Sequence, residues 1–370
     1  MPSLPSKCLA TLNGPNEMGR SPAFWICFLL VLGVAASAPV FLGRYDLLNL
    51  SNHLGNVFIA LGLCLIWGFC GILSLGQAVF LGLGGYVYGI VGINLIDQHG
   101  NTYVALLAGL LVPVAFAAVL GYFIFYARLK GVFVAILMLV VALLFETFMN
   151  QTAGPGWFIG DAHLGGNNGL GRFSGVIREP PSLSFGLGER GIEFGGTSWQ
   201  FYYLSLSLVV VAYLALRWLV NSKLGYVMIA IREDQERTEA LGYNVRLIQL
   251  GVFCIGALLA AVSGILYVSW GNFITPSVFG VHNNILPVIW VAVAGRKSLT
   301  ATVIGTIALV WLSQKLNQQG DYALVVLGSV LLFAMLIAPA GVIPTLADRI
   351  NALRRRIHKS ALVEAEDDRA

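Results

Sequence analysis

The densest group of ionisable side chains lies in residues 231–243, IREDQERTEALGY, in a sequence of which only 11% is charged. Charged side chains at these spacings can form ion pairs along a helix. Glu233 with Arg237 is an i,i+4 pair in the favourable order, and Arg232 with Glu236 is a pair in the reverse order. The chemistry that this pattern supports is recognition by charge. The charged residues of the segment are Arg232, Glu233, Asp234, Glu236, Arg237 and Glu239.

The stretch from Gly225 to Gly242 is rich in good helix formers, so we expect a short helix there. Ile231, Thr238 and Leu241 would share one side of this helix while charges occupy the others. Such a mixed surface can bind in a groove on another protein. A solvated helix that only joins two neighbouring segments is the alternative.

Catalytic and metal-binding patterns are missing from the sequence. The stretch AGRKS at 294–298 resembles the end of a phosphate-binding loop, but Arg296 separates the glycine from Lys297. No HExxH or GxSxG motif occurs, and the five cysteines and five histidines are scattered. We therefore expect no enzyme activity, no metal site, no disulfide framework and no cofactor bound by this chain.

Three polar residues in apolar surroundings could contact a transported solute or ion. Ser74 and Gln77 lie in GILSLGQ, a break between two apolar runs. If the break lies within a membrane, these side chains could hydrogen-bond a polar solute, because unwound backbone there must face protein or water. A tight turn at the surface is the alternative. Glu146 is the one evident ionisable candidate for ion coupling, and its place near a span end also fits a side chain that reaches water.

Composition explains where these residues must sit. The chain has 370 residues, of which 57% are hydrophobic, and a mean hydropathy of +0.80. Apolar runs near the roughly 20 residues that cross a bilayer recur along it. The sequence predicts an all-α, polytopic transmembrane bundle of eight to ten spans, with a half-helix at the short run containing Pro287. The expected spans are 23–42, 54–72, 77–96, 103–126, 131–150, 199–220, 247–270, 283–295, 299–316 and 322–343.

Lysine and arginine positions set the expected orientation. They place both termini in the cytoplasm and assign the net charge of +4 to topology rather than to nucleic-acid binding. A cleaved signal peptide is the alternative for the first run, but its length favours retention. The expected organisation is a cytoplasmic segment 1–22, a transmembrane domain 23–345 and a cytoplasmic tail 346–370. Within the domain, 151–198 is an extracytoplasmic loop and 221–246 a cytoplasmic one.

In the run 77–96, small residues recur at spacings of four, three, four and three, which places them on one face of a helix. Small residues allow helix backbones to approach closely where lipid supplies no hydrophobic drive for association. We therefore expect this helix inside the bundle, either as packing or as part of a solute path. The face consists of Ala78, Gly82, Gly85, Gly89 and Gly92.

Several motifs together resemble the permeases of ABC importers for branched-chain amino acids and urea. EALG, Glu239–Gly242 with Ala240 at its second position, resembles the cytoplasmic coupling segment of such permeases. The others occur in the family's order over roughly residues 50–345, and GGNNGL with RLKGVF is closer to the urea type. They are GILSLGQAVFLGLGGY (71–86), RLKGVF (128–133), GGNNGL (165–170), LGYVMIAIREDQERTEALGY (224–243), AGRKSLTATVIG (294–305) and LGSVLLFAMLIAPAGVI (327–343).

The resemblance implies a subunit of a larger machine in the bacterial inner membrane. Its partners would be a second, different permease, two cytoplasmic ATPases that bind ATP, and an extracytoplasmic solute-binding protein. Residues 231–242 would dock on an ATPase, and Asn167 and Asn168 of GGNNGL would serve the outer gate or receive the binding protein, unless they are only turn residues. The expected solute is urea or a related small amide. Branched-chain amino acids are the alternative solute, and a stand-alone urea channel or secondary carrier is the alternative class.

Overall fold

The computed structural model describes residues 12–19, 21–154, 156–171, 178–186, 192–317, 328–329, 332–333, 336–338, 341–346 and 349. Within these residues, eight helices are long and apolar enough to cross a membrane. The prediction of an all-α, multi-span bundle is therefore confirmed. The expected span 322–343 and the tail 346–370 lie largely outside the described residues.

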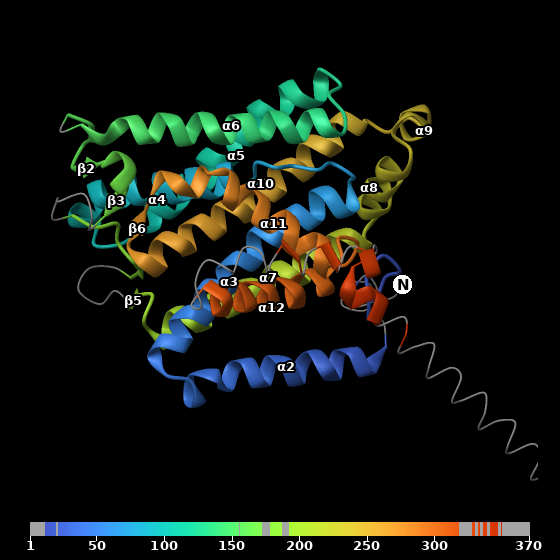
Figure 1. The fold of residues 1–370 in the computed structure, drawn as a ribbon, viewed down its shortest axis with the longest axis horizontal. Coiled ribbons are helices and arrows are strands. Elements are labelled where there is room, and N and C mark those ends of the chain that lie inside the picture. The colour runs from blue at the N-terminus through green and yellow to red at the C-terminus, as the bar shows by residue number, and fades with distance from the viewer. Residues whose placement is uncertain are drawn as a thin grey trace, which may run out of the picture.

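The bundle is built around α10, which packs against α3, α4 and α5. Figure 1 shows α6 along one edge of the bundle and α2 along the opposite edge. No residue of α2 is fully buried; Phe28 packs against Tyr213 of the bundle, whereas apolar side chains such as Leu30 and Val34 are exposed. The long helices are α2 (Pro22–Phe41), α3 (Arg44–Leu63), which continues as the π-helix η1 (Cys64–Phe69), α4 (Gln77–His99), α5 (Tyr103–Tyr126), α6 (Val132–Asn150), α7 (Trp199–Asn221), α10 (Val245–Gly271) and α12 (Leu299–Asn317).

Local capping explains several helix ends. The Ser198 hydroxyl accepts a hydrogen bond from Phe201 N at 3.1 Å and begins α7. The Asn244 amide oxygen does the same for Leu247 N at 3.2 Å and begins α10. Each cap satisfies one of the backbone donors that a helix start leaves unpaired. α4 ends at Gly100, whose left-handed φ of 62° suits glycine.

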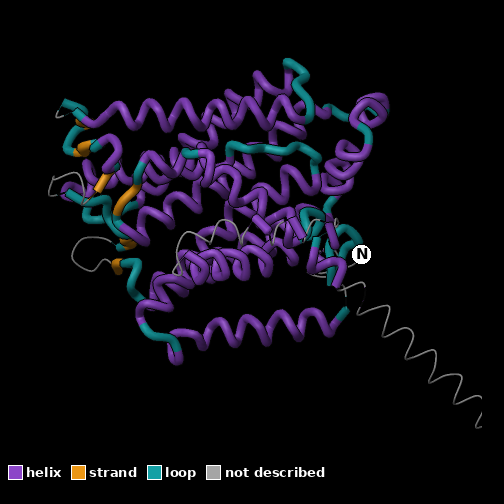
Figure 2. Tube along the Cα trace, viewed as in Figure 1, coloured by secondary structure: helices purple, strands orange, loops and turns teal. Residues whose placement is uncertain are grey.

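The two ends of the bundle differ in structure. Short antiparallel strand pairs gather at one end, here called the strand end (Figure 2). Leu170 pairs with Ile274 there and ties the loop after α6 to the loop after α10. The strands are β1 (Phe158–Ile159), β2 (Ala162–His163), β3 (Leu170–Gly171), β4 (Leu183–Phe185), β5 (Ile192–Phe194) and β6 (Phe273–Ile274), and three-residue or four-residue 3₁₀ turns lie beside them at η2 (Gln151–Ala153), η3 (Gly166–Asn168) and η6 (Pro276–Phe279).

The opposite end, here called the α8–α9 end, corrects one prediction. The expected single helix between Gly225 and Gly242 is wrong, because the chain forms α8 (Lys223–Glu233) and α9 (Gln235–Ala240). Asp234 separates them in an extended conformation, and its carboxylate accepts a hydrogen bond from Arg237 N at 2.9 Å. Aspartate favours the N-cap over a helix interior for this reason.

The break also changes the predicted ion pairs. Arg232 pairs with its neighbour Glu233 at 2.7 Å, and Glu236 pairs with Lys130 at 3.3 Å. Neither expected i,i+4 pair is present among the described residues. The pairs form differently because Asp234 turns α9 away from the axis of α8.

One span begins much earlier than predicted. The expected second span starts at residue 54, whereas α3 starts at Arg44. The first turns of α3 hold Arg44, Asp46 and Asn49, which lower the local hydropathy and hide the helix from a hydrophobicity scan. The remaining described spans agree with the predicted bounds to within a few residues.

Candidate functional site

Two helices begin inside the bundle rather than at its ends. Residues 71–76, here called the re-entrant segment, are not helical and run from the α8–α9 end towards the middle, where α4 starts (Figure 2). Its entrance lies against Arg232, since a Cβ added at Gly71 would stand 2.9 Å from the Arg232 side chain. Its exit at Gly76 lies close to the backbone of Met138, well inside α6. The backbone of this segment therefore runs through the interior of the bundle and does not form a surface turn.

Ser74 and Gln77 lie in this interior position, and each is 1% exposed. The Ser74 hydroxyl and both polar atoms of the Gln77 amide have no hydrogen-bond partner among the described residues. Buried polar groups are usually paired, so unpaired ones point to water or a ligand that completes them. They sit beside the start of α4, where backbone N–H groups and the helix dipole favour negative charge.

The second interior start belongs to α11 (Val281–Ala294), a 14-residue helix containing Pro287. Asn284 in its first turn accepts a hydrogen bond from Ala78 N of α4 at 3.2 Å. The same amide donates to Phe279 O at 2.7 Å and to Gly280 O at 3.0 Å. Asn284 therefore joins the starts of α4 and α11, and this contact is here called the α4–α11 junction. The expected half-helix at Pro287 corresponds to α11.

A polar cleft lies between this junction and the strand end. Its wider part has a volume of about 470 Å³ and its deeper part about 110 Å³. The two parts share five lining residues, so they form one continuous depression, and Ala78 of the junction lines the deeper part. The cleft, here called the amide cleft, is lined on its polar side by Asn49, Asn52, His53, Asn56, Asn283, Ser313 and Gln314, and on its aromatic side by Tyr45, Tyr267, Trp270 and Trp290.

The residues that α3 contributes to the cleft were not predicted from the sequence. Asn49, Asn52, His53 and Asn56 follow spacings of three, one and three, which place them on one side of a helix. Polar residues on one face of a membrane helix mark an interior or watery surface. His53 is 4% exposed, and its Nε2 lies 2.8 Å from the Gln314 amide oxygen on α12.

The small-residue face of α4 is buried along its whole length. A Cβ at Gly85 would lie 2.6 Å from Ile274 Cδ1 and 2.9 Å from Val268 Cγ2. Gly89 and Gly92 leave room for the strand-end loop, at Leu170 and near Pro181. The predicted face therefore packs mainly on loops and η6. The five residues of the face, Ala78, Gly82, Gly85, Gly89 and Gly92, are all buried.

The close contact of α4 with α10 involves Gly85 of the predicted face and also glycines outside that face. A Cβ at Gly84 would lie 2.8 Å from the Ala261 backbone on α10. A Cβ at Gly264 on α10 would clash with the Leu81 carbonyl on α4. The two backbones thus approach each other through Gly84 and Gly264, which the spacing rule applied to α4 alone did not single out.

Asn167 and Asn168 lie in η3 at the strand end, and both are exposed. They lie at the surface of the loop and do not line the amide cleft. Gly165, Gly166 and Gly169 around them all adopt positive φ values, which only glycine takes readily. The structure therefore separates these two asparagines from Ser74 and Gln77, with which the sequence grouped them.

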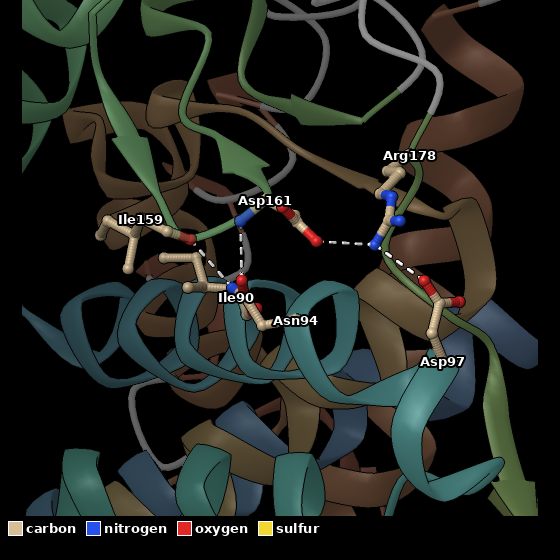
Figure 3. Close-up of polar contacts among 6 residues, drawn as sticks. All are labelled: Ile90, Asn94, Asp97, Ile159, Asp161 and Arg178. Carbon is tan, nitrogen blue, oxygen red and sulfur yellow. Dashed lines mark hydrogen bonds and ion pairs between the residues drawn. The ribbon is translucent and has the colours of Figure 1, made fainter.

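The loop after α6 is tied to the end of α4 by a polar network (Figure 3). Asn94 of α4 donates to Ile159 O at 2.9 Å and accepts from Asp161 N at 2.7 Å. Arg178 bridges Asp97 of α4 and Asp161 of the loop, at 2.9 Å to each. These contacts therefore hold the hairpin β1–β2 against the end of α4 that lies at the strand end.

The α8–α9 end presents the charged segment to its surroundings. Glu233, Asp234, Glu236, Arg237, Ala240 and Gly242 are exposed, and Glu239 is partly exposed. Ile231 and Thr238 pack inwards, whereas Leu241 is 73% exposed, so the predicted grouping of these three on one side is wrong for Leu241. The hydrogen bond from Arg232 holds the pKa of the Glu233 carboxyl below its usual value. Glu233 is thus charged at neutral pH.

Arg232 also links the charged segment to the membrane helices. Its Nη1 donates to Gly68 O in η1, directly before the re-entrant segment. A change in the position of α8 therefore acts on the chain that leads to the start of α4. The two residues are 164 positions apart, and nothing in the sequence indicated the contact.

The N-terminal segment forms a second structure that sequence reasoning missed. Glu17 is 4% exposed, and its carboxylate accepts from Ser298 Oγ at 2.6 Å, Leu299 N at 2.9 Å and Thr300 N at 3.1 Å. It therefore caps α12 from a distant part of the chain. The fully buried Arg217 of α7 donates to three backbone carbonyls of the same segment, at Leu12, Met18 and Gly19.

Glu146 lies partly buried beside Gly280, the N-cap residue of α11, rather than in lipid. A Cβ at Gly280 would stand 3.0 Å from the Glu146 carboxylate. A carboxylate near a helix start is favoured by the exposed N–H groups. Within the described residues, no group of three or more potential metal ligands is present.

Comparison with known proteins gives one family. The family model described as "Branched-chain amino acid transport system / permease component" matches residues 47–338. The high-affinity branched-chain amino acid transport system permease protein LivM of Escherichia coli K12 is 26% identical over 337 residues, which cover 85% of this chain and 73% of LivM. The ribose import permease protein RbsC of the same strain is 27% identical over 323 residues, which cover 84% of this chain and 90% of RbsC. No solved structure matches the chain.

Proposed function

This chain belongs to the family of branched-chain amino acid transport permease components, and from that premise we propose that it forms the solute path of an ATP-driven branched-chain amino acid importer. The relatives are permease proteins of transport systems, which confirms that the chain is a transport component and not an enzyme. They favour the amino-acid alternative over the expected urea or small amide. One relative is a ribose import permease, so the relatives do not all transport amino acids.

The observation that carries the proposal is the amide cleft ending at the α4–α11 junction. A branched-chain amino acid has a carboxylate, an ammonium group and an apolar side chain. Amide side chains and two helix starts can bind the carboxylate, and amide oxygens can bind the ammonium group. Tyr267, Trp270 and Trp290 offer aromatic surface to the apolar side chain. Ser74 and Gln77 come just before Ala78 of the junction in the sequence. Their unpaired polar atoms suit a gate.

The energy source in this proposal is a pair of cytoplasmic ATPases that dock on the exposed residues of α8 and α9. A second permease would complete the path, and an extracytoplasmic solute-binding protein would deliver the solute at the strand end. This arrangement puts the α8–α9 end in the cytoplasm of a bacterial cell and agrees with the lysine and arginine positions. Coupling requires that the docked segment bind differently in two states of the ATPases.

The strand end offers Asn167 and Asn168 as exposed contacts for the binding protein. Alanine at both positions should weaken docking of the binding protein to the complex in a pull-down titration. Unchanged docking would mean that the two asparagines only form the turn, as their glycine-rich surroundings also permit.

The decisive experiment is uptake by proteoliposomes that contain the complete complex, with labelled leucine, urea and ribose offered separately. The proposal expects ATP-dependent leucine uptake that exceeds urea and ribose uptake. Asn52→Ala should raise the KM for leucine, because it removes one amide from the cleft. Urea or ribose uptake in place of leucine would refute the solute assignment, and uptake by this chain without ATP would refute the class.

A further inference from the structure

A second cavity lies at the α8–α9 end, away from the amide cleft. It has a volume of about 200 Å³ and is enclosed by the start of the re-entrant segment, the end of α5, the loop 129–131, α8–α9 and the start of α10. At about 30 Å³ for each water in the liquid, this is room for roughly seven water molecules. The cavity is larger than a simple ion needs.

One wall is polar and carries positive charge. Lys130, Arg232, Gln235 and Gln249 line it. Gln249 is only 7% exposed, yet its amide makes no hydrogen bond with any residue that the structure describes. An amide that lines a cavity and bonds no neighbouring side chain is free to bond a polar group that enters the cavity. Two cations beside it favour an anionic one.

The acidic residues nearby do not fill this need. Glu236 pairs with Lys130 and Glu233 pairs with Arg232, but the two carboxylate side chains are 85% and 66% exposed and point to solvent. Exposed ion pairs of this kind are weak and easily exchanged. The cations can therefore contact an anion in the cavity while Gln249 donates to it from within.

The lining also includes apolar side chains. Ile72, Phe125, Val134 and Ile231 are among them, and all four are buried. An inorganic anion would leave these side chains without contacts. A molecule with a negative group at one end and a short branched hydrocarbon at the other could contact both the polar and the apolar lining.

We propose that this cavity binds a small monocarboxylate with an apolar side chain. The carboxylate lies between Lys130 and Arg232 and accepts from the Gln249 amide, and the hydrocarbon lies against Phe125 and Val134. Because the site joins α8–α9 to the entrance of the re-entrant segment, an occupied cavity restrains the docking segment. This restraint on transport rests on the proposed function, whereas the binding itself does not.

The binding test uses the purified full chain in phosphatidylcholine nanodiscs and 4-methylpentanoate as the probe. Ligand-observed NMR should show saturable binding that 4-methylpentan-1-ol, which lacks the carboxylate, does not reproduce. Gln249→Leu should weaken the affinity at least fivefold. Lys130→Gln, at a side chain that is 53% exposed, should also weaken it. The matched control Gln314→Leu alters the amide cleft and should leave this binding unchanged.

Three results would overturn the proposal. The first is no saturable binding, or binding that Gln314→Leu abolishes and Lys130→Gln and Gln249→Leu leave intact. The second is inorganic phosphate that binds as tightly as the probe, which would mean a simple anion site. The third is loss of probe binding in nanodiscs that contain phosphatidylglycerol, which would mean that a lipid phosphate occupies the cavity.

The restraint is measured separately in proteoliposomes that hold the complete complex. The probe on the ATPase side should lower the initial rate of ATP-driven uptake at least twofold, and Gln249→Leu should relieve the effect. An unchanged rate despite demonstrated binding would refute the restraint alone. Absence of uptake without the probe would count against the proposed function and not against the cavity.

Discussion

Asn284→Ala tests whether the α4–α11 junction holds the interior of the bundle together. Asn284 is 1% exposed and makes three hydrogen bonds, from Ala78 N and to the carbonyls of Phe279 and Gly280. The substitution removes all three. Gly280 O keeps a partner, because Asn284 N also donates to it at 3.2 Å. The Ala78 N–H and Phe279 O lose their bonds to this side chain in a buried place.

Two estimates bound the cost. The bond from Ala78 N joins two helices, a kind of bond that averages about 0.6 kcal/mol in membrane proteins, and the same value for the two bonds within the start of α11 gives roughly 2 kcal/mol in all. A buried polar group left unpaired costs about 1–3 kcal/mol, so two such groups give up to about 6 kcal/mol. We expect Asn284→Ala to lower the free energy of unfolding by about 2–5 kcal/mol, since water can enter from the cleft and satisfy part of the loss.

The adjacent Asn283→Ala is the matched control. Asn283 is partly exposed, and its amide makes one hydrogen bond, to Ser277 O at 2.7 Å. Its loss should cost about 1 kcal/mol or less. Equilibrium unfolding in mixed micelles measures both variants against the unaltered protein. If the two variants differ by less than about 0.5 kcal/mol, the junction does not stabilise the bundle as argued.

Exchanging the charges with Arg237→Glu and Glu239→Arg should abolish ATP-driven uptake while the protein still inserts, because docking by charge is lost; uptake at the original rate would contradict this. Gly85→Leu should lower the melting temperature by several degrees, whereas Gly251→Leu, where a Cβ meets nothing within 4 Å, should not. Glu17→Ala should cost about 1–3 kcal/mol, because it leaves the start of α12 uncapped; unfolding measurements that match the unaltered protein would refute the cap.

Hydropathy predicted the fold because lipid imposes a strong, local rule on each span. The same use of hydropathy is the reason that the amide cleft was not predicted. Asn49 and Asn52 of the cleft, with Arg44 and Asp46, lower the hydropathy of the first turns of α3, so the predicted span started only at residue 54. The signal was available as a polar stripe at helical spacing, and it pointed to the interior rather than to a loop.

Other features depend on contacts that one sequence does not record. Glu17 caps α12 across 282 positions, and Arg217 binds the same N-terminal segment from α7. Helix capping is readable when the cap precedes the helix, as at Asp234, and is not readable when it arrives from elsewhere. The break at Asp234 was therefore predictable from capping preference, but helix-forming neighbours outweighed it.

The structure also shows how movement at the α8–α9 end can reach the amide cleft. Arg232 bonds to Gly68 O and lies against Gly71, so α8 holds the entrance of the re-entrant segment. Only six residues separate that entrance from α4, and fully extended they span at most about 20 Å. The segment joins α4 at Gln77, next to Ala78, whose N–H bonds to Asn284. In the proposed coupling, a pull on the segment would act first on this hydrogen bond, and the junction would need two discrete arrangements, as coupling between distant sites requires.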